Sequence, residues 1–352
     1  MNYFTVNARE LASLMKLATP FLPSRSVLPI IENFKVEIKD LSLFLTATNL
    51  EHGVTLFCQA ESSSSFSFVC PPLLGATLEK LSDQPVTIEV GDQLTVKAKE
   101  GEYVMALEDP SDYPDTPVVT DEPVSVNSDT LLMILNRVGF CASKDPDKPA
   151  LSAVLLSGDA CVATDAHRLA WIDREGLPSA KIPINTFRAL SGLLKASQGV
   201  GVSANDQHGQ MDFKNGSAWF RLPDHKYPSW RGIIPKYDGQ IEVDRELFLS
   251  SITRAILYVS SSKSHTLLAV LELDGDELRI SAEDADYGIS SKEVIPVENP
   301  SKLKFKKGVN IKNLESIVSN CNKVMIETNS AGNTAFLIKD EDVNYLLMPM
   351  LI

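Results

Sequence analysis

A short alternating strand followed by an amphipathic helix occurs three times in this chain, and this repeat constrains the fold more than any other feature. The copies begin at residues 4–7, 124–127 and 241–244, where apolar side chains alternate and the last residue is Asn or Asp. A side-chain oxygen at such a position commonly caps a helix, and apolar residues at helical spacing follow each one. The intervals are close to one third of the 352 residues, so the pattern predicts three units of similar fold.

Each copy also contains a second helix and several strands. Hairpins such as 86–96, with a Gly-Asp turn, follow the second helix, and no alternating strand–helix rhythm of a parallel sheet occurs. The sequence therefore predicts an α+β fold with antiparallel sheets and two helices per unit. The predicted helices cover residues 8–19, 72–82, 128–140, 184–196, 245–259 and 311–323.

Two segments rich in Pro and Asp, 115–123 and 235–239, separate the copies. Such composition is typical of linkers. The sequence therefore predicts three domains, over residues 1–119, 120–237 and 238–352.

The charge is unevenly distributed along the chain. There are 46 acidic and 33 basic residues, a net charge of −13, which excludes a uniformly basic coat for nucleic acid but not a local basic surface. The predicted helices are nevertheless net positive. These cations either solvate helix faces or line a surface that faces phosphates, and the second interpretation requires the helices to share one side.

Several classes of protein are disfavoured by composition. The five cysteines are scattered, and neither a C-x-x-C pair nor a histidine motif for zinc occurs, so we expect reduced thiols and no metal. The first residues lack the basic and apolar regions of a signal peptide, and no stretch reaches the roughly 18 apolar residues of a membrane helix. We expect a cytoplasmic protein with no membrane partner and no cofactor.

Two features favour an enzyme only weakly. Residues 199–204 fit G-x-G-x-x-A, but a turn follows where a dinucleotide site needs a helix, so we predict a strand that enters a hairpin. Asp165 beside His167 suggests acid–base chemistry, yet no nucleophile accompanies them and pocket lining is the preferred interpretation. No catalytic residue is predicted.

Two motifs carry a resemblance to a known family. Residues 162–170 read Val-Ala-Thr-Asp-Ala-His-Arg-Leu-Ala, and residues 345–352 read Tyr-Leu-Leu-Met-Pro-Met-Leu-Ile. Together with residues 28–31, residues 112–114 and the threefold repeat, the whole chain resembles the bacterial sliding clamp, the beta subunit of DNA polymerase III. The resemblance implies three domains of the DNA-clamp fold per chain and a head-to-tail dimeric ring of six domains, with helices around the hole.

The resemblance also implies a function in DNA replication without catalysis. The ring would encircle duplex DNA without reading its sequence and tether the replicative polymerase catalytic subunit, which raises its effective concentration at the primer end. A clamp loader would open the ring, and other proteins with a clamp-binding motif would share the same groove.

Carried over residue by residue, the resemblance assigns three sets of positions. A partner-peptide groove between the second and third domains would use Leu151, Thr164, His167, Arg168, Leu169, Pro228, Ile233, Leu346, Leu347, Met348, Pro349 and Met350. Phosphates would meet Arg25, Arg137, Lys144, Lys148, Arg188, Lys195, Arg254 and Lys263. The dimer interface would use Tyr103, Val104, Met105 and Leu107 against Leu257 and Tyr258.

Some positions depart from the family pattern. Ala166 stands where Gly is usual, Gly232 where a second Arg is frequent, and Leu351 where the tail commonly has Arg. The loop at 144–150 also lacks aromatic residues. These departures motivate an alternative, a divergent clamp-like protein that binds clamp partners as a monomer without encircling DNA.

Overall fold

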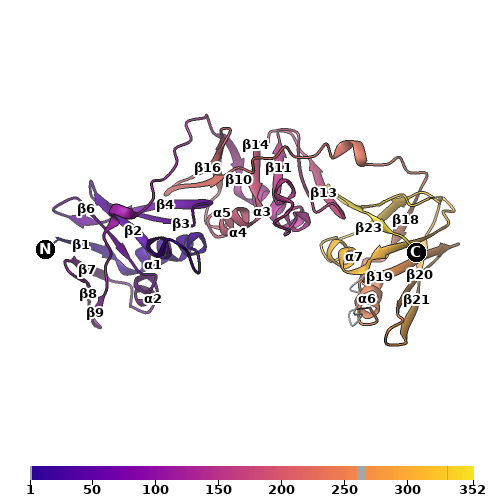
Figure 1. Cartoon of the computed structure of the whole chain (residues 1–352), viewed down its shortest axis with the longest axis horizontal. Coiled ribbons are helices and arrows are strands. Elements are labelled where there is room, and N and C mark those ends of the chain that lie inside the picture. The colour runs from indigo at the N-terminus through magenta and orange to yellow at the C-terminus, as the bar shows by residue number, and fades with distance from the viewer. Residues whose placement is uncertain (1, 260–266, 331) are drawn as a thin grey trace. The chain divides into compact units, whose positions relative to one another are not determined.

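The computed structural model describes residues 2–259, 267–330 and 332–352. The chain forms two compact units. Figure 1 shows the helices and strands along the chain, coloured by residue number. Unit 1 consists of Met1–Met133 and Pro178–Asp224, and unit 2 of Ile134–Leu177 and His225–Ile352. Each unit thus combines segments from more than one predicted domain, and the three domain boundaries stay a prediction.

Unit 1 contains two antiparallel sheets. In the smaller one, Phe4 pairs with Ile88, and the predicted hairpin at 86–96 is present. Its order is β5 (Glu61–Ser62), β1 (Asn2–Asn7), β7 (Pro85–Val90), β8 (Leu94–Ala98) and β9 (Gly101–Met105). The larger sheet has the order β10 (Val124–Asn127), β15 (Gly199–Ala204), β16 (His208–Phe213), β17 (Gly216–Arg221), β4 (His52–Gln59), β3 (Ser42–Thr48), β2 (Phe34–Lys39) and β6 (Phe66–Cys70).

The larger sheet of unit 1 continues across a predicted domain boundary. Strand β17 pairs with β4, with Gly216 opposite Leu56. A Cβ on Gly216 would lie 2.1 Å from the carbonyl oxygen of Thr55, and its φ of 146° also favours glycine. Residues 199–204 form β15, as predicted, and a turn leads from β15 into β16.

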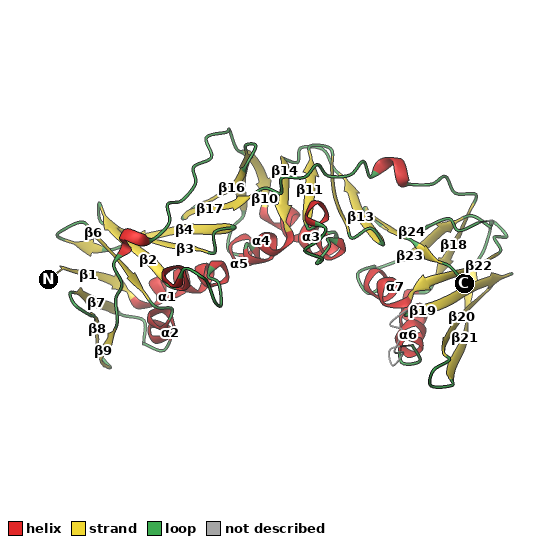
Figure 2. Cartoon of the chain, viewed as in Figure 1, coloured by secondary structure: helices red, strands yellow, loops and turns green. Residues whose placement is uncertain are grey.

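One helix of unit 1 packs directly on these sheets, and a second packs on the first (Figure 2). Helix α1 (Ala8–Ala18) begins after Asn7, whose side chain accepts the N–H of Glu10, and it packs on α2 (Leu73–Glu79), β3 and β4. The helix predicted at 184–196 divides at Leu190 into α4 (Ile184–Ala189) and α5 (Ser191–Lys195), after β14 (Ser179–Pro183).

Unit 2 contains one long antiparallel arrangement of strands. Pairing of β13 with β25 joins the second and third predicted domains. The order is β11 (Ala153–Ser157), β12 (Ala160–Thr164), β13 (Arg168–Asp173), β25 (Val343–Leu347), β24 (Phe336–Asp340), β23 (Val324–Thr328), β18 (Gly239–Val243), β21 (Ile289–Glu298), β20 (Glu277–Asp284), β19 (Leu268–Asp274), β22 (Phe305–Asn310) and β26 (Pro349–Met350).

Helices α6 (Arg245–Ile256) and α7 (Ile311–Val318) of unit 2 pack on each other (Figure 2). The side chain of Asp244 caps α6 by accepting the N–H of Leu247, as the repeat predicts. Helix α3 (Ser128–Arg137) contributes its last turn to unit 2. Short 3-10 turns occur at Thr19–Phe21, Pro29–Glu32, Pro110–Asp112, Gly139–Cys141, Pro149–Leu151 and Arg231–Ile233.

The α+β class with antiparallel sheets is confirmed. The five cysteines are free and buried, as expected for reduced thiols. None of the helices in the described part of the chain has the length and apolar character needed to cross a membrane.

Candidate functional site

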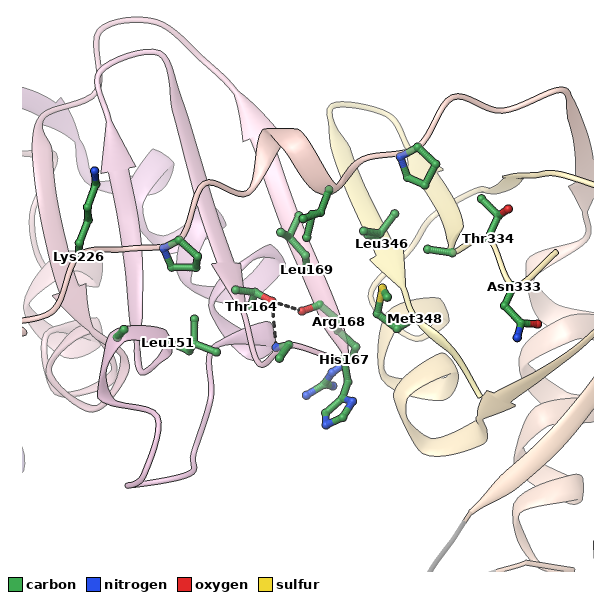
Figure 3. A pocket seen from close by; sticks show the side chains of 16 residues that line it. Leu151, Thr164, His167, Arg168, Leu169, Lys226, Asn333, Thr334, Leu346 and Met348 are labelled. Atoms are coloured by element: carbon green, nitrogen blue, oxygen red, sulfur yellow. Dashed lines mark hydrogen bonds between the residues drawn. The ribbon is translucent and has the colours of Figure 1, made fainter. Parts of the chain in front are cut away.

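A groove with a volume of about 620 Å³ lies within unit 2 (Figure 3). Its size is typical of a cleft that receives a ligand. The lining residues are Ala150, Leu151, Thr164, Ala166, His167, Arg168, Leu169, Lys226, Pro228, Ile233, Pro235, Asn333, Thr334, Ala335, Leu346 and Met348.

The floor of the groove is apolar because two strands meet there. Leu169 of β13 lies opposite Leu346 of β25, and both side chains are almost fully buried. Met348 and Ile233, by contrast, are 43% and 55% exposed beside this floor. Exposed flexible and branched apolar side chains next to a buried floor suit an apolar partner segment.

The turn between β12 and β13 is held in place by its own side chains. Thr164 Oγ1 donates to the carbonyl of Arg168 at 2.6 Å and accepts the N–H of Ala166 at 3.1 Å (Figure 3). Asp165 accepts the N–H groups of His167 and Arg168 at 2.9 and 2.7 Å. Ala166 has a φ of 76°, in the left-handed region that favours glycine.

Arg168 is engaged by protein groups. Its Nε and Nη2 donate to Asp165 at 3.0 and 2.7 Å, and Nη1 donates to Ser316 Oγ of α7 at 2.6 Å. The guanidinium also lies over the ring of Phe140 at 5.7 Å. Arg168 therefore fastens the turn to α7, and Asp165 compensates its charge.

This geometry does not resemble an acid–base pair. The hydrogen bonds of Asp165 within the described residues go to backbone N–H groups and to Arg168, whereas the His167 side chain is exposed. A general base needs a partner within hydrogen-bond reach that orients it. The arrangement instead suits pocket lining.

Most of the predicted groove residues line the groove, but three do not. Leu347 is fully buried, and Pro349 and Met350 form β26, which pairs with Val309 and Gly308. The sequence reasoning missed Ala150, Ala166, Lys226, Pro235 and the segment 333–335. Lys226 and Pro235 flank predicted positions, but no motif marks 333–335, which tertiary structure alone brings to the groove.

Some of the predicted phosphate-binding cations lie close to carboxylates, and others are exposed to solvent. Arg137 pairs with Asp340 and donates to Tyr345, and Arg254 pairs with Glu293, so these two charges are compensated. Lys148 lies 3.8 Å from Asp145, and Lys263 lies outside the described residues. Arg25, Arg188 and Lys195 of unit 1 and Lys144 of unit 2 are exposed.

The predicted interface residues lie at strand edges and a helix end. Tyr103, Val104 and Met105 belong to β9, the last strand of its sheet, and Leu107 follows it. Leu257 and Tyr258 follow α6 and are exposed. Strand β21 pairs with β18 at Val297 and Glu298, and among the described residues its part at 289–296 is open on that side, without a strand partner.

Known proteins share this sequence pattern and fold. Residues 2–117 match the family model described as DNA polymerase III beta subunit, N-terminal domain. The beta sliding clamps of Haemophilus influenzae and Staphylococcus aureus are 22% and 23% identical, with 99% of each chain covered. The resemblance expected from the two motifs is thus confirmed.

Solved structures of such proteins share the fold of this chain. The DNA polymerase III beta subunit of Thermotoga maritima aligns with a TM-score of 0.90 at 21% identity, covering 100% of both chains. The sliding clamp of Bartonella birtlesii bound to griselimycin aligns with a TM-score of 0.91 at 20% identity, again over 100% of both. The clamp of Pseudomonas aeruginosa bound to griselimycin gives 0.87 at 21%, with 100% of both chains covered.

Proposed function

This chain has the fold of the bacterial beta sliding clamps and matches them in sequence from end to end, and from that premise we propose that it is a DNA sliding clamp. The observation that carries the proposal is the groove of unit 2, whose apolar floor and fixed turn are built from the two motifs of the resemblance. The protein acts as a processivity factor in DNA replication in the cytoplasm and has no catalytic activity of its own.

The active form is a homodimeric ring closed head to tail. The open edge of β9, with Val104 exposed, pairs with the third domain near Leu257, Tyr258 and the open part of β21. An unpaired strand edge favours addition of another strand. Six domains then surround duplex DNA.

The ring holds DNA by topology and by weak phosphate contacts. Arg188 and Lys195 lie exposed on α4 and α5, and Arg25 and Lys144 lie in exposed loops. Such cations attract phosphates without reading bases, which permits sliding. Arg137 and Arg254 contribute little to the phosphate contacts, because each is already paired with a carboxylate.

Partners bind through a short, largely apolar peptide in the groove. They include the replicative polymerase catalytic subunit, the clamp loader and other proteins with a clamp-binding motif. Tethering by such a peptide raises the partner's effective concentration at the primer end without strengthening the chemistry itself.

Retention on DNA tests encirclement. The chain is loaded onto circular nicked DNA with a matched clamp loader, and we expect it to be retained at moderate salt and released after linearisation. Mass in solution should be twice that of the chain. A monomer that binds partner peptide but is never retained would support the sequestering alternative instead.

Binding of griselimycin tests the groove. We expect the chain to bind it and Ile233→Ser to weaken binding about tenfold, because burial of an exposed Ile side chain is worth about 1.5 kcal/mol. Val27→Ser, at an exposed apolar position of unit 1 and therefore outside the groove, is the control and should bind normally. Equal affinities of the two variants would exclude Ile233 from the binding surface.

A further inference from the structure

Strand β22 carries a lysine that is buried in the interior of unit 2. Lys307 is 2% exposed, and its Nζ donates to Thr328 Oγ1 at 2.7 Å and to the carbonyl oxygen of Thr334 at 3.1 Å. The rings of Phe336 and Phe305 lie 5.3 and 5.9 Å from Nζ. Lysine is almost never fully buried unless paired. The ion pairs found among the described residues do not include Lys307, and the charge of Asp238 only partly offsets the effect of burial on its pKa.

The second acceptor, Thr334, belongs to one end of the groove. Asn333, Thr334 and Ala335 line it (Figure 3). This segment precedes β24, and the ladder between β24 and β23 ends at Leu337 and Glu327. Residues 333–335, which we call the groove wall, therefore lie outside that ladder.

Through its hydrogen bond to the Thr334 carbonyl, Lys307 links the groove wall to strand β22. A charged donor makes a stronger hydrogen bond to a carbonyl than a neutral donor does. Burial lowers the pKa of Lys307, which reflects the free-energy cost of enclosing the ammonium in apolar surroundings. Lys306, the next residue along β22, is exposed and lies 4.0 Å from Glu272, so its side chain is on the other face of the strand.

We propose that Lys307 is a positioning residue for the groove. By holding the Thr334 carbonyl, it fixes the course of residues 333–335 and thereby the shape of this end of the groove. The groove then accepts a peptide that has apolar side chains over Leu169, Leu346 and Met348 and that fits against the wall. This inference rests on the proposed function of the groove as a peptide-binding site.

Lys307→Met tests this role with griselimycin as the probe. Met has a similar length and packs against the two Phe rings, so we expect the melting temperature to be maintained while the affinity falls about tenfold. Lys306→Met removes the same charge from the neighbouring position and should bind like the unmodified chain. Lys307→Gln retains a donor and should restore part of the affinity, which a merely structural loss would not produce.

Hydrogen–deuterium exchange of the free protein provides a readout that does not depend on binding. We expect faster exchange at residues 333–335 in Lys307→Met than in Lys306→Met. Unchanged exchange and affinity in Lys307→Met would overturn the proposal, and should that variant not fold, Lys307→Gln is judged by the same two measurements. The unmodified chain could fail to bind griselimycin while hydrogen–deuterium exchange at residues 333–335 is still faster in Lys307→Met. That result would contradict the proposed function of the groove, but not the role of Lys307 in holding the wall.

Discussion

Ala166 adopts a backbone conformation that is unfavourable for a residue with a Cβ atom. The residue adopts a φ of 76° in the turn that lines the groove, with its N–H bound to Thr164. An L-residue pays roughly 1–2 kcal/mol for this conformation. The turn persists because Asp165 and Thr164 satisfy its backbone groups from both sides.

Ala166→Gly should stabilise the chain by about 0.5 kcal/mol. Relief of the left-handed strain exceeds the extra flexibility that Gly gives the unfolded chain. The measurement is urea denaturation, with Ala76→Gly, at an exposed position of helix α2, as a control that should destabilise. A loss of stability in Ala166→Gly would show that the turn is not strained.

His52 makes unit 1 sensitive to acid. Its ring is buried, Nδ1 lies 3.0 Å from Thr186 Oγ1, and burial lowers its pKa from 6.5 to about 4. The unfolded chain therefore binds a proton below about pH 6.5 that the folded chain does not bind until about pH 4. The contribution to stability is present above pH 6.5 and is lost as the pH falls through this window.

The free energy of unfolding of unit 1 should drop by up to about 2 kcal/mol more between pH 7 and pH 5 in the unmodified chain than in His52→Gln. Denaturant titrations at the two pH values measure this difference. Parallel pH curves for the chain and His52→Gln would contradict the assignment.

At the scale of elements, the proposed dimer depends on the free edges of sheets. Strand β9 pairs with β8 through Thr95 opposite Val104, and its other side has no strand partner among the described residues. Proline removes the backbone donor and is tolerated in sheets mainly at edges. A proline at this edge should therefore prevent pairing with a second chain while the sheet itself still folds.

Val104→Pro should therefore shift the protein from dimer to monomer with little loss of stability. Sedimentation velocity measures the shift, and Val118→Pro, in an exposed stretch between strands, is the control that should stay dimeric. A dimer as stable as that of the unmodified chain would exclude β9 from the interface.

At the scale of the whole molecule, the distribution of charge matters more than its sum. The net charge of −13 repels DNA, so the proposed contact with DNA depends on the exposed cations of the helices. Each phosphate contact contributes about 0.9 to the slope of log affinity against log salt concentration.

Arg188→Glu combined with Lys195→Glu should reduce the magnitude of that slope by about two, because two phosphate contacts are lost, and should shorten the residence time on DNA. Equilibrium binding to short linear duplex DNA at several salt concentrations measures this slope, because release from a closed circle would report ring opening instead. Lys39→Glu combined with Lys97→Glu, at exposed strand positions, adds the same charge and should leave the slope nearly unchanged. Equal slopes in both pairs would show that α4 and α5 do not face DNA.

The sequence by itself determined the elements and the class of fold. The caps at Asn7 and Asp244 and the helical spacing after them are local signals, because a helix satisfies its backbone within a few residues. The same locality explains why the turn at 164–168, with its own hydrogen bonds, is recognisable as a motif.

Only the tertiary structure decided which segments share a unit and which charges are free. The pairings of β17 with β4 and of β13 with β25 join residues far apart in sequence, and strand pairing leaves no local mark of its partner. The partners of Arg137 and the wall at 333–335 likewise depend on distant residues. The sequence specifies the type of each side chain, but its burial and its partners depend on the packing of strands that are far apart in the sequence.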